Sequence, residues 1–174
     1  LMSAKEWGEP GIAFFKSDHH GTNPCAEIGL LAMCIRDGKG DPVDNITIDM
    51  LENMEFYQSK KGYSYYHGWQ ACNLTEINMA RNKTRYEFLE ACKAAAIIGT
   101  LQASYINTGY LTHTTKRIIE AEALIGVSLT GMCENALSFD PELLQDGSSL
   151  VNSTNSKYSD VFRVNYASRT TCIK

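Results

Sequence analysis

The sequence lacks the features that mark membrane proteins and nucleic-acid-binding proteins. No apolar run reaches the roughly 20 residues needed to cross a bilayer, and the N-terminus has no basic region followed by an apolar core. Lysine and arginine are not clustered, and a net charge of −4 gives no electrostatic footprint for duplex nucleic acid or an anionic membrane. We therefore expect a cytoplasmic protein that binds no membrane and no nucleic acid, so that any nucleotide would bind as a small molecule.

Cysteine spacings typical of zinc ribbons and thioredoxin-like sites are also missing. The chain has six cysteines but no Cys-x-x-Cys, and its length does not suggest a small secreted scaffold held by disulfides. The potential metal ligands that lie nearest one another in sequence are His19, His20, Cys25 and Cys34. Their spacing fits no standard structural zinc site. We expect reduced thiols, one pair of which is redox-active, and no metal.

The hydrophobic pattern predicts an α/β protein. With 174 residues, 44% of them hydrophobic, the chain can form one domain with a sizeable core. Residues 70–79 and 125–129 are typical of strands, and residues 84–105 of a long helix that begins with a Thr84–Glu87 capping box. Strands that alternate with helices favour a mainly parallel sheet.

Four further elements are expected from local composition. Residues 47–59 have the pattern of a helix that ends at Gly62, and Thr114 or Thr115 is expected to cap a helix that runs to residue 124. The Ser/Asn-rich residues 146–156 predict a polar connection with little regular structure, and residues 168–174 a last strand.

The stretch Asn-Pro-Cys-Ala-Glu-Ile at residues 23–28 has the composition of a reactive loop. Pro24 fixes its own φ and favours an extended Asn23, so the side-chain period should be two. Asn23, Cys25 and Glu27 then point to one side. A cysteine can be a nucleophile, a ligand or a radical carrier, a glutamate can take a proton, and an asparagine can donate and accept hydrogen bonds. The alternative is a buried loop cysteine beside a solvated glutamate.

Five segments, in the same order, resemble the ribonucleotide reductases, especially the adenosylcobalamin-dependent (class II) enzymes of the monomeric triphosphate-reducing group. Residues 23–28 resemble the finger loop of the active site, and Gly-Glu-Pro-Gly-Ile-Ala-Phe at 8–14 resembles the stretch before it. Ala-Cys-Asn-Leu-Thr-Glu-Ile-Asn at 71–78 resembles the strand with the second redox cysteine, and residues 99–105 and 124–131 resemble a later helix and strand. The resemblance spans nearly the whole chain.

This resemblance implies a fold, a reaction and a role in that reaction for four residues. The chain would be part of the ten-stranded α/β barrel whose centre holds the finger loop, and it would reduce ribonucleotides to 2′-deoxyribonucleotides. Cys25 would carry a thiyl radical and abstract the 3′ hydrogen of the ribose. Glu27 would remove the 3′-hydroxyl proton, and Asn23 would hydrogen-bond the ribose oxygens. Cys72 matches one cysteine of the reducing pair, whose partner precedes Leu1. Cys34, which is nearer to Cys25 in sequence, is the rival.

The resemblance also implies the partners. Adenosylcobalamin would be the radical source, a ribonucleoside triphosphate or diphosphate the substrate, and a thioredoxin-type dithiol the reductant. We expect the chain to be one segment, residues 1–174, of a longer catalytic barrel domain, because the phosphate loop of the family follows the match to residues 171–174. The segment alone is expected to be inactive, and its remaining cysteines, Cys92, Cys133 and Cys172, to be structural.

The main departure from the family is an insertion at about residues 30–70, because the family joins its two active-site cysteines by a shorter connection. We expect the insertion to fold outside the barrel, with its aromatic run (Tyr63, Tyr65, Tyr66, Trp69) packed on the body or a partner. Two alternatives to the class II enzyme stay open. One is a class I or class III relative, and the other is a non-catalytic or split-gene fragment that binds a complementary chain.

Overall fold

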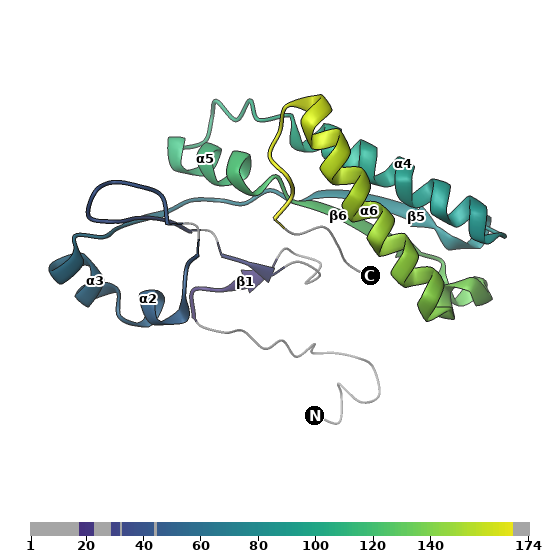
Figure 1. Cartoon of the computed structure of the whole chain (residues 1–174), viewed down its shortest axis with the longest axis horizontal. Helices are drawn as coiled ribbons and strands as arrows, with labels where there is room; N and C mark the ends of the chain where they lie inside the picture. Colours follow the sequence, from purple (N-terminus) through teal and green to yellow (C-terminus); the bar gives the residue numbers. More distant parts are fainter. Residues whose placement is uncertain (1–17, 23–28, 32, 44, 169–174) are drawn as a thin grey trace, which may run out of the picture.

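The computed structural model describes residues 18–22, 29–31, 33–43 and 45–168 (Figure 1). Along the chain they form β1 (Gly21–Thr22), β2 (Gly29–Leu30), β3 (Met33–Arg36), α2 (Ile48–Glu52), α3 (Met54–Lys61), β4 (Ser64–His67), β5 (Asn73–Asn78), α4 (Arg85–Ala103), α5 (His113–Glu122), β6 (Ile125–Thr130) and α6 (Pro141–Phe162). In these residues no helix combines the length and the apolar character needed to cross a bilayer.

The strands of the described residues pair into three two-stranded sheets. The β1–β2 and β3–β4 pairs are antiparallel, and β5–β6 is parallel. A parallel pair needs a long crossover, which α4 and α5 supply between β5 and β6. The α/β prediction is confirmed in this coarse form. Only one of the three pairs is parallel, and the ten-stranded barrel remains a prediction.

The helix α4 begins as the sequence predicts and buries one stripe of mostly small residues. The Thr84 hydroxyl accepts from the Glu87 N–H at 3.2 Å, and the Glu87 carboxylate accepts from the Thr84 N–H at 3.0 Å, which completes the capping box. Residues that recur every three or four positions form the buried stripe: Phe88, Cys92, Ala95, Ala96, Gly99, Thr100 and Ala103.

Two glycines let three elements approach one another closely around α4. A Cβ on Gly99 would lie 3.4 Å from Ile125 Cβ and 3.6 Å from the Asn73 carbonyl oxygen, so α4 packs close to β5 and β6 there. A Cβ on Gly147 of α6 would lie only 2.8 Å from the Phe88 ring. In Figure 1, α4 and α6 lie together over β5 and β6. The expectation that a backbone passes close to Gly99 is confirmed.

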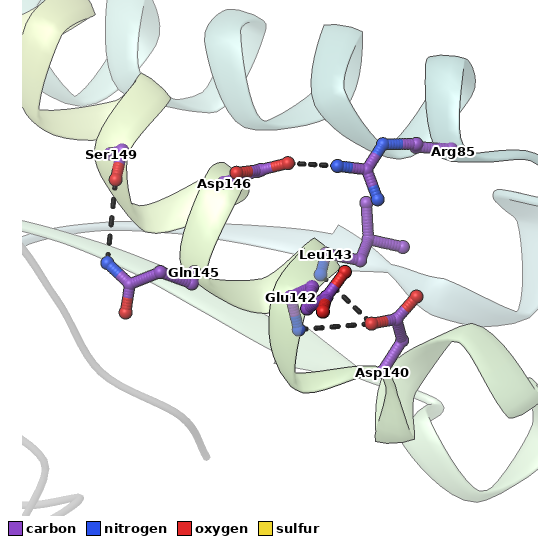
Figure 2. A network of polar contacts seen from close by, with 7 residues as sticks. All are labelled: Arg85, Asp140, Glu142, Leu143, Gln145, Asp146 and Ser149. Atoms are coloured by element: carbon purple, nitrogen blue, oxygen red, sulfur yellow. Dashed lines mark hydrogen bonds and ion pairs between the residues drawn. The ribbon is translucent and has the colours of Figure 1, made fainter.

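The start of α6 is fixed by its first residues and by one ion pair (Figure 2). The Asp140 carboxylate accepts from the backbone N–H groups of Glu142 and Leu143 at 3.0 and 3.1 Å, and Pro141 occupies the first helical turn. Asp146 forms an exposed ion pair with Arg85 at the start of α4. Such a pair contributes at most about 1 kcal/mol, so the buried faces determine the packing of α4 on α6.

A buried asparagine links α4, α6 and the segment that follows α6. Asn155 is 1% exposed, and its amide donates to the Thr100 hydroxyl at 2.9 Å, while that hydroxyl donates to the Ala96 carbonyl at 2.7 Å. The Asn155 carbonyl oxygen accepts from the Ala167 N–H at 3.0 Å. Because all these groups are removed from water, each hydrogen bond avoids the cost of an unsatisfied buried polar group.

Residues 31–65 have an apolar cluster of their own. Met33, Ile35 and Leu51 are buried in it, and Tyr63 and Tyr65 pack against it from the side. The Tyr65 hydroxyl also donates to the Met50 carbonyl at 2.8 Å, which joins β4 to α2. These two tyrosines therefore stabilise the segment itself. Figure 1 shows α2 and α3 at the opposite end of the molecule from α4 and α6.

Three expectations about helices are corrected. The 47–59 helix is two helices, which Thr47 begins, Asn53 interrupts and Gly62 ends with φ 70°. The cap of α5 is Thr112 instead of Thr114 or Thr115, since the Thr112 hydroxyl accepts from the Thr115 N–H. Residues 146–156, expected to be a polar connection, lie inside the 22-residue α6, because small polar side chains on its inner face fit against α4.

We predict that Asn155→Ala lowers the free energy of unfolding by about 2 kcal/mol or more, because it leaves the buried Ala167 N–H without its acceptor and removes the hydrogen bond that the Thr100 hydroxyl accepts. Urea unfolding followed by circular dichroism measures this. Ser153→Ala is the control, since Ser153 is exposed on the same helix, and should change stability by less than about 0.5 kcal/mol. Equal effects of the two substitutions would contradict the assignment.

We also predict a pH dependence from the capping box. Hydrogen bonds from the Lys83 N–H, and then from the side chain and N–H of Thr84, lower the pKa of Glu87 below its usual 4.5. The stabilisation is therefore fully present above about pH 4.5 and is lost as the pH falls through the folded-state pKa. The stability difference between wild type and Glu87→Gln should shrink from pH 6 to pH 3. A constant difference between wild type and Glu87→Gln over this pH range would contradict the prediction.

Candidate functional site

The predicted finger-loop residues Asn23, Cys25 and Glu27 lie outside the described residues. The strands on either side of them are described. Thr22 pairs with Gly29 and Gly21 with Leu30 in the antiparallel β1–β2 pair. The two ends of the 23–28 segment are therefore held side by side.

Cys72 directly precedes β5 and lies in a small apolar cluster. Leu124 is buried at its centre, and Leu30, Cys72 and Leu74 pack against it. Gly126 on β6 makes room for these side chains, since a Cβ there would lie 2.6 Å from Leu74 Cδ2 and 3.5 Å from Cys72 Sγ. Leu30 belongs to β2, the strand that follows residues 23–28, so this strand and Cys72 share one cluster.

The alternation of β5 places Cys72 on the face opposite α4. Thr75 donates to the Ala95 carbonyl of α4 at 3.3 Å, and Ile77 belongs to the main core with α4 and α6. Because successive side chains of a strand point to opposite faces, Cys72, Leu74 and Glu76 occupy the other face. We call this the Cys72 face.

Ser128 adds a polar group to the same face from β6. It is aligned with Glu76 in the parallel register and lies two residues after Gly126. Its side chain is fully buried, and its hydroxyl has no hydrogen-bond partner within residues 18–22, 29–31, 33–43 and 45–168. A buried hydroxyl without a partner costs about 1–3 kcal/mol, so Ser128 is a candidate site residue that the sequence pattern did not indicate.

Cys34, the rival redox cysteine, lies in a different environment. It is on β3, where Met33 and Ile35 enter the 31–65 cluster and Cys34 and Arg36 face the other way. There it lines a pocket with Tyr66 and residues of α5. Cys34 is not part of the cluster that contains Cys72 and Leu30.

The other described cysteines differ sharply in accessibility. Cys92 is 2% exposed in the core, and burial raises the pKa of its thiol to about 11. Cys133 is exposed just after β6. Cys172 lies outside the described residues. The prediction that Cys92 is a core residue is confirmed.

Within the part of the chain that the structure describes, no group of three or more His, Cys, Asp or Glu side chains is placed to hold a metal ion. Comparisons with models of protein families, with curated proteins and with solved structures found no match. The resemblance to ribonucleotide reductases therefore stays a prediction from the sequence motifs.

We predict that brief treatment of the native protein with iodoacetamide modifies Cys133 and leaves Cys92 unmodified, since the Cys92 thiol is buried and stays protonated at pH 8. Peptide mass spectrometry measures the modification of each cysteine. In urea both should react at similar rates. Modification of native Cys92 as fast as Cys133 would contradict this packing.

Proposed function

We propose that the chain is a catalytic segment of a ribonucleotide reductase that replaces the 2′-hydroxyl of a ribonucleotide by hydrogen. The observation that carries this proposal is the shared cluster of Leu30 and Cys72. It joins β2, which directly follows Asn-Pro-Cys-Ala-Glu-Ile, to the start of β5, despite 41 intervening residues (31–71). A radical cysteine and a reducing cysteine that act on one ribose must be brought together in this way.

Chain length supports the same arrangement. Cys25 is three residues from Thr22 and five from Leu30, and extended chain covers at most about 3.6 Å per residue. Cys25 therefore lies within about 11 Å of Thr22 along the chain. The insertion does not prevent the approach of the two cysteines, because the cost of closing a loop grows only logarithmically with its length.

In the proposed reaction each of these residues has a separate role. Cys25, as a thiyl radical, takes the 3′ hydrogen atom of the ribose, which leaves a carbon radical at C3′. Glu27 accepts the 3′-hydroxyl proton while the 2′-hydroxyl leaves as water, and Asn23 hydrogen-bonds the ribose oxygens. Cys72 and a second cysteine supply the proton that the departing 2′-hydroxyl takes up, the hydrogen atom that replaces it at C2′ and one further electron, and they become a disulfide. Glu27 then returns its proton to the 3′ oxygen, and Cys25 returns the hydrogen atom to C3′ and becomes a thiyl radical again. The extended loop that Pro24 favours would present all three finger-loop side chains to one sugar.

Adenosylcobalamin, when bound, would supply the radical by homolysis of its cobalt–carbon bond. The pocket beside Cys34, about 190 Å³, is too small for a corrin ring, and we assign no described residue to the cofactor. The substrate, a ribonucleoside triphosphate or diphosphate, and a thioredoxin-type dithiol belong to the same proposal. The sequence resemblance favours the class II enzyme over a class I relative.

We predict that Cys25→Ser, made in the complete catalytic chain, abolishes nucleotide reduction in both single and multiple turnovers, because serine cannot carry the radical. Cys72→Ser should instead block multiple turnovers that depend on a dithiol system. Cys133→Ser is the matched control and should retain wild-type turnover. Product analysis with adenosylcobalamin and a thioredoxin system measures all three.

Three outcomes would contradict this assignment. Turnover by Cys25→Ser would remove the radical role of Cys25. Loss of multiple turnovers in Cys34→Ser but not in Cys72→Ser would transfer the reducing role to Cys34. No reduction by the complete wild-type chain with cofactor and reductant present would favour the non-catalytic fragment.

A further inference from the structure

A pocket separate from the Cys72 face lies where the β3–β4 hairpin meets α5. It has a volume of about 190 Å³ and is lined by six residues of three elements: Cys34, Arg36, Tyr66, His113, Thr114 and Arg117. The hairpin is fixed against α5 beside it, since the Trp69 N–H donates to the Thr115 hydroxyl at 3.2 Å and Gly68 packs closely on Thr115 and Ile118.

The lining of this pocket is cationic. Arg36 comes from the end of β3 and Arg117 from α5, so two arginines that are distant in sequence line one space. Among the described residues, no aspartate or glutamate lines it. Arg36 is half-buried, and one of its N–H groups is used by the Gly40 carbonyl, which fixes the side chain and leaves its other donors for a ligand. Guanidinium groups favour an anion with several oxygens as their ligand.

The first residues of α5 add backbone hydrogen-bond donors to the lining of this pocket. Thr112 caps this ten-residue helix by accepting from the Thr115 N–H, and the first backbone hydrogen bond of the helix runs from the Lys116 N–H to the Thr112 carbonyl. His113 and Thr114 come before these residues in the helix, so their backbone N–H groups have no acceptor within it. Both residues line the pocket. The positive end of the helix dipole favours an anion at this position.

We propose that this pocket binds the phosphate group of a small phosphorylated molecule. Arg36 and Arg117, from separate elements, line the same space as the first residues of α5, and the described lining holds no carboxylate. The guanidinium and N–H groups of these residues match the charge and the several acceptor oxygens of a phosphate. Tyr66 forms an aromatic wall and is 43% exposed, so the ring of a nucleotide can stack beside its phosphates. This inference does not depend on the reductase assignment.

Isothermal titration calorimetry of the full chain with pyrophosphate and, separately, with magnesium-free adenosine triphosphate tests the proposal. Wild type should bind one equivalent of at least one probe. Arg117→Gln and Arg36→Gln should each weaken that binding about tenfold or more, because each removes a charge-assisted hydrogen bond. Lys116→Gln is the matched control: it removes the same charge one residue away, on a side chain that does not line the pocket, and should change binding less than twofold.

The two probes distinguish the phosphate from the rest of the ligand. Tighter binding of the nucleotide, with the advantage lost in Tyr66→Ala, identifies a nucleotide site, whereas equal binding identifies a site for phosphate alone. Arg117 is exposed, so Arg117→Gln keeps the test valid if Arg36→Gln does not fold, as circular dichroism would show. No binding of either probe by wild type, or equal weakening by Lys116→Gln and Arg117→Gln, would overturn the proposal.

Discussion

The close approach of α4 to the β5–β6 pair is the constraint on which the rest of the described structure depends. A Cβ at Gly99 would already be in van der Waals contact with Ile125 and the β5 backbone, so a side chain longer than that of alanine would press on them. On the other side of the stripe, Gly147 lets α6 fit against Phe88. With α4 and α6 both on one face of β5–β6, the opposite face remains available to Cys72, Leu74 and Ser128. The packing of α4 and α6 therefore determines which face of the β5–β6 pair is left for the candidate site.

The structure separates two kinds of environment for its thiols. Cys92 is enclosed by the helices and is held protonated by burial. Cys72 and Cys34 are partly buried at the edges of two different sheets, one next to the β1–β2 pair and the other beside two arginines. Cys34 is close in sequence to Cys25, yet it lines a pocket and belongs to neither the Leu30–Cys72 cluster nor the 31–65 cluster.

The parts of the fold that the sequence predicted are those with strong local signals. The Thr84–Glu87 capping box, the long apolar helix after it and the buried strand at residues 125–129 were all predictable, because capping and burial are encoded within a few residues. The helix α6 was missed because its inner face uses Gly147, Thr154 and Asn155, which are poor helix formers individually. Tertiary packing compensates for this, and Asp140 and Pro141 stabilise the start of the helix.

The candidate site was predictable only where the residues are adjacent in sequence. The finger-loop motif could be found by its composition, whereas the grouping of Leu30, Cys72 and Leu124 depends on long-range packing. Ser128 and the Arg36–Arg117 pair were missed for the same reason, since no spacing in the sequence links them.

The parallel pairing of β5 with β6 has a consequence for the order of folding. Asn73 aligns with Ile125, so this pair forms only after the chain between them, with α4 and α5, has been brought back. The hairpin β3–β4 and its two helices make contacts mainly within residues 31–65. Because local contacts form faster than distant ones, the segment of residues 31–65 is expected to acquire structure first. Cys34 would then reach its final position before the strand beside Cys72 is paired.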